Sequence, residues 1–67
     1  MTDFSYRRLE DANGVIYRVV ERDEYGGFTS DWFKVAGSID YATEEEARRE
    51  VLRLAKVRKG YIVEVLK

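Results

Sequence analysis

Residues 13–22 read Asn-Gly-Val-Ile-Tyr-Arg-Val-Val-Glu-Arg, a turn signal followed by a run of strand-forming residues. Its Asn13-Gly14 start is typical of a two-residue hairpin turn of type I′, which needs positive φ at both central positions. Residues 15–20 are dense in β-branched and aromatic side chains, which favour strands. We therefore predict that 15–22 is the central strand of a sheet, and that residues 4–9 pair with it across the turn.

The rest of the sheet follows from a second turn and a closing strand. Gly26-Gly27 predicts a tight turn into a third strand over 28–36, and residues 61–66 form a short apolar strand at the end. With one helix between these two strands, the last strand has to run parallel to the first. We predict a single α+β domain over 1–67: a three-stranded antiparallel meander, one helix and a closing strand (β-β-β-α-β), in a four-stranded mixed sheet of order 4-1-2-3. Pairing of the last strand beside the third is the alternative.

The helix has clear signals at both ends. Thr43 begins a capping box, in which its hydroxyl accepts the Glu46 amide while the Glu46 carboxylate reaches back. Acidic residues at the start and Arg58 and Lys59 at the end match the helix dipole. Gly60 is expected to end the helix in a left-handed conformation. One face of the helix is apolar and carries Ala47, Val51, Leu54 and Ala55.

Alternation along the strands sorts the side chains onto two faces of the sheet, if Ala12 pairs with Val15 and Tyr25 with Phe28. The first face carries Phe4, Tyr6, Arg8, Val15, Tyr17, Val19, Glu21, Trp32, Lys34 and Ala36. The second carries Ser5, Arg7, Leu9, Ile16, Arg18, Val20, Arg22, Asp31, Phe33 and Val35. Burying the unpaired guanidinium of Arg18 under a helix would be costly. We therefore expect the helix to cover the first, aromatic face, joined by Tyr61 and alternate residues after it.

The second face is then predicted to stay open and to bind a protein. Aliphatic side chains interspersed with arginines are typical of protein interfaces. The partner-binding residues predicted are Arg7, Leu9, Ile16, Arg18, Val20, Arg22, Phe33 and Val35. Arg18 would be the central anchor, so Val20→Glu or Arg18→Glu should abolish binding and leave the fold intact. The partner would be a second copy of the chain or a larger complex. A solvated face on which Arg22 pairs with Asp31 is the alternative.

A different class of function, nucleic-acid binding, is the second interpretation. It would use a basic stripe on the helix: Arg48, Arg49, Arg53, Lys56 and Lys59. The net charge of −1, from 12 basic and 13 acidic residues, gives no general attraction to phosphates. Helical spacing also predicts ion pairs that would occupy three of these cations: Glu44–Arg48, Glu45–Arg49 and Glu50–Arg53.

Composition argues against catalysis. The chain has no His and no Cys, which excludes a catalytic triad, imidazole or thiolate metal ligands and a thiol nucleophile. We expect no enzyme activity, no catalytic residues, no metal, no cofactor and no small-molecule substrate. The start of the chain lacks the features of a signal peptide and no apolar run is long enough to cross a bilayer, so a cytoplasmic protein is expected. Its size and composition resemble those of small accessory proteins of phages and mobile elements, which implies an inhibitor or regulator of a larger complex.

Overall fold

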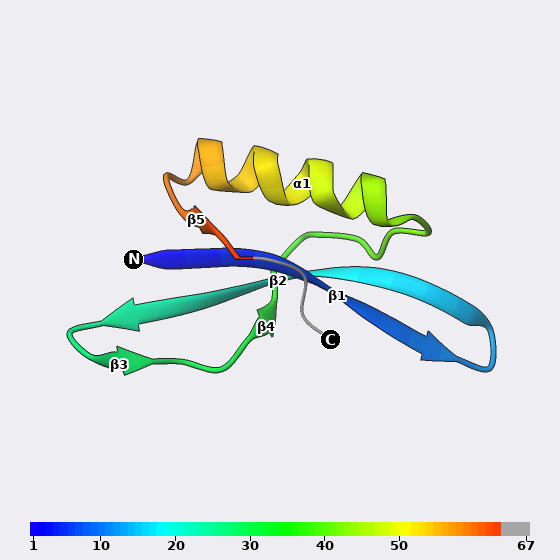
Figure 1. Ribbon diagram of the computed structural model, residues 1–67, viewed down its shortest axis with the longest axis horizontal. Coiled ribbons are helices and arrows are strands. Elements are labelled where there is room, and N and C mark those ends of the chain that lie inside the picture. Colours follow the sequence, from blue (N-terminus) through cyan, green and yellow to red (C-terminus); the bar gives the residue numbers. More distant parts are fainter. Residues whose placement is uncertain (64–67) are drawn as a thin grey trace.

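The computed structural model describes residues 1–63. The molecule is elongated, with extents of 40 × 21 × 21 Å, because one long hairpin runs along its whole length (Figure 1). Along the chain, the elements are β1 (Thr2–Asp11), β2 (Gly14–Tyr25), β3 (Phe28–Thr29), β4 (Phe33–Lys34), α1 (Glu44–Val57) and β5 (Tyr61–Ile62).

These elements form one mixed sheet with a helix on one side, which confirms the predicted α+β fold. β1 pairs antiparallel with β2 and parallel with β5, and the order along the sheet is β3-β2-β1-β5, with β4 also on β2. The last strand therefore lies beside the first, as predicted, and α1 packs mainly against β1 (Figure 1). The turn at Gly26-Gly27 is also confirmed, since Tyr25 pairs with Phe28.

The first turn lies one residue earlier than predicted. Asp11 pairs with Gly14, so the predicted pair of Ala12 with Val15 is wrong. The Asn13 N–H donates to the Asp11 carboxylate at 2.7 Å, and Gly14 follows with φ of 121°. A turn followed by a glycine of positive φ is the common alternative to the type I′ hairpin. The strand pairing shifts by two residues as a result, and because side chains alternate with period two, both strands keep their predicted faces.

The predicted third strand consists of two short strands, β3 and β4. Glu24 pairs with Thr29 in β3, and Glu21 pairs with Phe33 in β4. From the first of these pairs to the second, the position in β2 changes by three residues, from 24 to 21. The position in the segment that pairs with β2 changes by four, from 29 to 33. The additional residue is a bulge, and it reverses the alternation of every side chain that follows.

Val35 shows the consequence of this bulge. Its N–H donates to the Val19 carbonyl at 3.1 Å, and its side chain is only 4% exposed in the core. The prediction that Val35 belongs to the open face is therefore wrong. Phe33 is exposed, but its register beside Glu21 puts it on the other side of the sheet from the arginines.

The start of α1 follows its sequence signals. The Thr43 hydroxyl accepts a hydrogen bond from the Glu46 N–H at 3.3 Å, as predicted. The Glu46 carboxylate reaches back to the Thr43 hydroxyl, at 2.8 Å, rather than to its backbone N–H. The three predicted ion pairs along the helix are also present: Glu44–Arg48, Glu45–Arg49 and Glu50–Arg53.

The end of α1 differs from the prediction. Lys59, not Gly60, has the left-handed conformation, with φ of 54°, and the Gly60 N–H donates to the Ala55 carbonyl at 2.8 Å. This is the Schellman arrangement, in which Gly60 follows the left-handed residue instead of being that residue. Gly60 is required for close packing instead: a Cβ there would lie 2.6 Å from the Thr2 carbonyl oxygen and 2.7 Å from Phe4 Cδ2.

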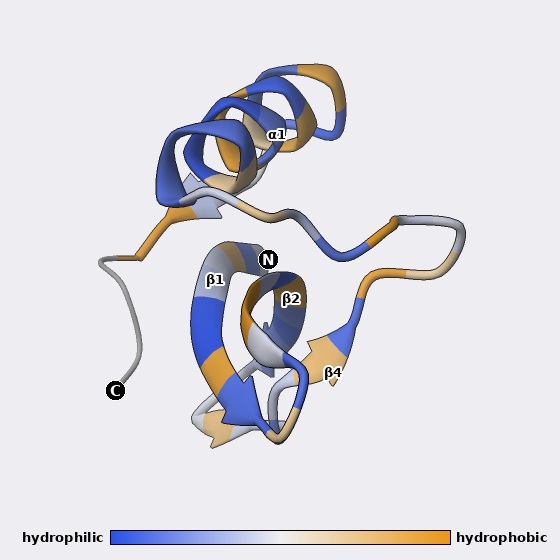
Figure 2. Ribbon diagram, turned by 90° about the vertical axis from the view of Figure 1, so that its right-hand side faces the viewer, coloured by the Kyte–Doolittle hydropathy of each residue, from blue (hydrophilic) through white to orange (hydrophobic). Residues whose placement is uncertain are grey.

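The core lies between α1 and the aromatic face of the sheet, as predicted (Figure 2). Ring and aliphatic side chains of the strands meet the apolar stripe of the helix, and Tyr17 and Tyr41 pack at the margin. The buried cluster is Phe4, Tyr6, Val19, Val35, Ala47, Val51, Leu54 and Ala55. This core leaves the opposite side of the sheet without a helix in the described part of the chain.

The faces predicted for the last strand are reversed. In the parallel register, Ile62 lies beside Phe4 and Tyr61 beside Asp3. Paired residues of neighbouring strands share a face, so Ile62 is on the helix side and Tyr61 on the other. Residues 64–67, which include the end of the closing strand predicted over 61–66, lie outside the described residues.

Candidate protein-binding surface

The sheet face away from α1 is divided into two halves along β1 and β2. The half near the N terminus of β1 is closed. There the Arg22 guanidinium donates to the Asp3 carboxylate at 3.0 Å and lies 4.3 Å from the centre of the Trp32 ring. Asp3 is buried, and the nearby Val20 is only 3% exposed. Arg22 therefore pairs with Asp3, and not with Asp31 as the alternative interpretation of a solvated face expected.

The half near the first turn is built from two cross-strand pairs. Arg7 lies opposite Arg18, and Leu9 lies opposite Ile16. All four are half-buried, so part of each side chain is accessible. Because they are two residues apart within each strand, they are neighbours on one face. We call these four residues the arginine patch. They lie toward the end of the hairpin that projects past the start of α1 (Figure 1).

Arg18 is held in place by Asp40. Its Nε donates to one carboxylate oxygen at 3.0 Å and its second guanidinium nitrogen to the other at 3.1 Å. Tyr41 supports this geometry by pairing with Tyr17 through two backbone hydrogen bonds of 2.7 and 2.8 Å. These bonds place the segment that carries Asp40 beside β2. The hydrogen bond from Arg18 lowers the pKa of Asp40, and the hydrogen bond to Asp40 raises the pKa of Arg18. Both groups stay charged at neutral pH.

Arg7 has no such partner among residues 1–63. Its Nε atom is buried and makes no hydrogen bond, and no carboxylate there forms an ion pair with it. Directly opposite is Arg18, and like charges in a cross-strand pair are unfavourable. A buried donor without a partner costs about 1–3 kcal/mol. Among residues 1–63, Asp40 balances only one of the two arginines, so this part of the chain leaves one positive charge of the arginine patch uncompensated.

The arginine patch contains half of the partner-binding residues that the sequence predicts. Val20 and Arg22 share its face but take part in the closed half. Val35 is in the core, and Phe33 is on the other side of the sheet. A charge at position 20 would be buried, so Val20→Glu is expected to destabilise the fold, contrary to the expectation from sequence.

The basic stripe of α1 is largely neutralised within the helix. Arg48 pairs with Glu44 at 2.9 Å and also donates to the Tyr6 hydroxyl, and Arg49 pairs with Glu45 at 2.8 Å. Arg53 pairs with an acidic residue one turn earlier. In the described part of the chain, only two cations of the stripe form no ion pair: Lys56 and Lys59. The stripe is present where the sequence predicts it, but most of its charge is already balanced.

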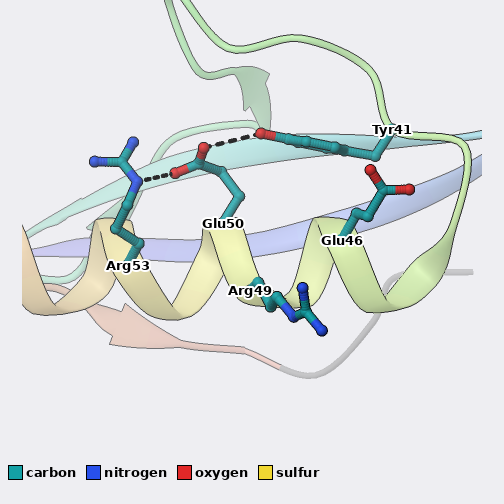
Figure 3. Close-up of a pocket in the computed structure, with 5 residues that line it drawn as sticks. All are labelled: Tyr41, Glu46, Arg49, Glu50 and Arg53. Carbon is teal, nitrogen blue, oxygen red and sulfur yellow. Dashed lines mark hydrogen bonds and ion pairs between the residues drawn. The ribbon is translucent and has the colours of Figure 1, made fainter.

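A hollow of about 270 Å³ opens beside α1 (Figure 3). Its lining consists of Tyr41, Glu46, Arg49, Glu50 and Arg53. The Tyr41 hydroxyl donates to Glu50 at 2.9 Å, and Arg53 donates to the same carboxylate. The hydrogen bond with Arg53 lowers the pKa of Glu50, and the bond to Glu50 raises the pKa of Tyr41. Every charged group in this lining has a partner within the fold, so we assign no ligand to it.

The described residues contain neither a cluster of metal-ligating side chains nor a helix that could cross a membrane. Within residues 1–63, no three metal-ligating side chains lie close enough together to hold an ion. The single helix described there is too short and too polar to cross a membrane.

Sequence reasoning missed two residues that shape this face, Asp40 and Trp32. Asp40 lies in a connecting loop, and nothing in its own neighbourhood indicates an arginine of β2 as its partner. Trp32 was predicted on the aromatic face, but it lies under Arg22. The sequence signal for an interruption of the strand before Trp32 is Ser30-Asp31, because both residue types are uncommon in strands and favour local turns.

Comparisons of the chain with protein-family models, with curated proteins and with solved structures gave no match in any of the three.

Proposed function

We propose that this protein is a non-enzymatic binding module that attaches to another protein through the arginine patch, as a regulator or inhibitor of a larger complex. The observation that supports this most is Arg7, a half-buried arginine with an unsatisfied Nε, next to the exposed parts of Leu9 and Ile16. Such a group is destabilising in the isolated chain, and a turn of the half-buried side chain toward an acceptor on a partner would relieve it. Arginine beside aliphatic side chains is also a common composition for the centre of an interface.

Nucleic-acid binding by the helix is less well supported. Arg48, Arg49 and Arg53 would each have to leave a carboxylate in order to contact a phosphate. The arginine patch itself combines two cations with two aliphatic residues, whereas phosphate-binding surfaces are rich in polar and basic groups throughout.

The test compares two substitutions that introduce the same charge at different places. Ile16→Glu puts a carboxylate into the arginine patch, and Leu52→Glu puts one on the outer side of α1, where Leu52 is 51% exposed. Binding proteins are captured from the native cell with the unchanged chain and with each variant, then identified and purified. Their affinity for all three chains is measured by isothermal titration calorimetry, and circular dichroism verifies that the variants are folded.

We expect Ile16→Glu to weaken binding at least tenfold, because it places a charge in a desolvated contact, and Leu52→Glu to leave it unchanged. If the partner binds folded Ile16→Glu as well as the unchanged chain, the proposal is wrong. Binding of an oligonucleotide that falls steeply with salt and is lost in Arg53→Glu would favour the helix stripe instead.

A further inference from the structure

We infer that the arginine patch recognises one carboxylate side chain, an Asp or Glu flanked by apolar residues, in an extended segment of a different protein. This inference rests on the proposed function and adds the chemistry of the partner. The carboxylate would sit between the guanidinium groups of Arg7 and Arg18, and the apolar neighbours would cover Leu9 and Ile16.

The charges on this face favour an anion with one negative charge. Two arginines lie directly opposite each other, and Asp40 compensates only Arg18, through two hydrogen bonds of 3.0 and 3.1 Å. Among the described residues, one added carboxylate would bring the charge of the two arginines and Asp40 to zero. It would also supply an acceptor for the guanidinium group of Arg7, whose buried Nε makes no hydrogen bond in the described structure. The planar fork of a guanidinium matches the two oxygens of a carboxylate, so such a contact can be bidentate.

The neighbouring residues favour a peptide over a phosphate group. The next cross-strand pair along the face is Leu9 and Ile16, which lie two residues from Arg7 and Arg18 in their strands. In an extended peptide, side chains on one side are also spaced two residues apart. A carboxylate bound at the arginine pair would therefore bring an apolar side chain two positions away over the aliphatic pair.

A second copy of this chain is a poorer occupant. Of the acidic residues that follow the patch in β1, Glu10 is on the helix side of the sheet and pairs with Arg8 at 3.0 Å, and the Asp11 carboxylate is held at the first turn by the Asn13 N–H. A symmetric contact through the patch would bring together four arginines, of which only two have a compensating carboxylate among residues 1–63. Charge complementarity thus indicates a partner other than the chain itself.

The experiment uses a random peptide library displayed on phage, selected on the whole protein. An enriched peptide is synthesised in two forms, with its acidic residue kept or replaced by the matching amide (Glu→Gln or Asp→Asn). Affinities are measured for the unchanged chain, for Arg7→Gln and for the control Arg8→Gln. Arg8 is the adjacent arginine, but its side chain is on the helix side of the sheet and 52% exposed. We expect the amide form to bind the unchanged chain and Arg8→Gln about tenfold more weakly or worse, since bonds to charged groups are strong. In Arg7→Gln this difference should largely disappear.

Each other outcome overturns a defined part of the reasoning. If replacing the carboxylate by the amide weakens binding to Arg7→Gln as much as binding to the unchanged chain, the carboxylate binds elsewhere and the inference is wrong. If enriched peptides lack an acidic residue but lose binding in Ile16→Glu, the proposed function stands and the carboxylate inference fails. If no peptide is enriched, or none is sensitive to Ile16→Glu, both fail. If sedimentation shows a dimer that Arg7→Gln dissociates, the occupant is a second copy.

Discussion

Gly60→Ala tests whether the junction between α1 and β5 is as tightly packed as the structure shows. A Cβ at this position would lie 2.6 Å from the Thr2 carbonyl oxygen, 2.7 Å from Phe4 Cδ2 and closer still to Phe4 Cε2. None of these atoms can easily move. Phe4 is completely buried at the centre of the core, and the Thr2 carbonyl oxygen is part of the backbone of β1.

The magnitude follows from two opposing effects. Inserting a methyl group into a packed region costs about 1–3 kcal/mol, and three contacts below normal distance favour the upper part of that range. Replacing glycine by alanine also reduces the entropy of the unfolded chain, which offsets about 0.4–1 kcal/mol. The expected net loss is about 2 kcal/mol, which lowers Tm by roughly 8–16 °C for a domain of this size. The whole domain is stable by only about 3–10 kcal/mol at the usual value per residue.

Urea unfolding followed by circular dichroism would measure this loss. Phe4→Leu alone and the double variant Phe4→Leu with Gly60→Ala complete a cycle, since the smaller side chain gives the new methyl group room. We expect the two substitutions to couple favourably by at least about 0.5 kcal/mol, as residues in contact do. A loss below about 0.5 kcal/mol for Gly60→Ala, or strict additivity with Phe4→Leu, would refute the packing argument.

Two further predictions concern the end of α1 and the support of the arginine patch. Lys59→Gly should raise the free energy of unfolding by about 0.5–1 kcal/mol, because Lys59 has φ of 54° and glycine adopts this conformation without strain; an unchanged or lower value in urea unfolding would contradict this. Asp40→Asn should lower stability at neutral pH, because Arg18 holds the pKa of Asp40 below its ordinary value and the charged form therefore stabilises the fold. This contribution is present above about pH 4, the unfolded value, and is lost as the pH falls through the lower folded value, so the two unfolding curves should converge as the pH is lowered below about 4. A difference that stays constant as the pH is lowered would show that the ion pair is not its source.

The helix could be predicted almost completely from sequence, because its determinants are local. A cap needs Thr43 and Glu46 three residues apart, and ion pairs need residues three or four apart, so both can be found in the sequence. Even there, the left-handed residue is Lys59 and not, as predicted from the sequence, Gly60. The reason is that Gly60 packs against β1, more than fifty residues earlier in the chain, and no local signal reports this contact.

The sheet was predicted in outline but not in register. Moving the first turn by one residue did not matter, because it shifted the pairing by two and preserved both faces. The bulge between β3 and β4 did matter, because a shift of one residue moved Val35 from the open face into the core. A periodicity of two makes strand predictions robust to even shifts and fragile to odd ones.

For the candidate surface, alternation along β1 and β2 placed Arg7, Leu9, Ile16 and Arg18 together, and the structure agrees. It could not show which arginines already have partners. Arg18 finds Asp40 across 22 residues and Arg22 finds Asp3 across 19, so only folding distinguishes these from Arg7.

The helix, the first hairpin and the α+β arrangement can be predicted from the amino-acid sequence, because turn residues, capping residues and hydrophobic periodicity act over a few positions. The side of the sheet that α1 covers can also be predicted from the sequence, because an arginine in the middle of a strand, here Arg18, is costly to bury under a helix. Only the tertiary structure decided that half of the other side is closed by Asp3, Arg22 and Trp32, and that Arg7 alone among its three arginines lacks a carboxylate in the described residues. The physical reason is that charge compensation depends on distances in space between residues far apart in the chain.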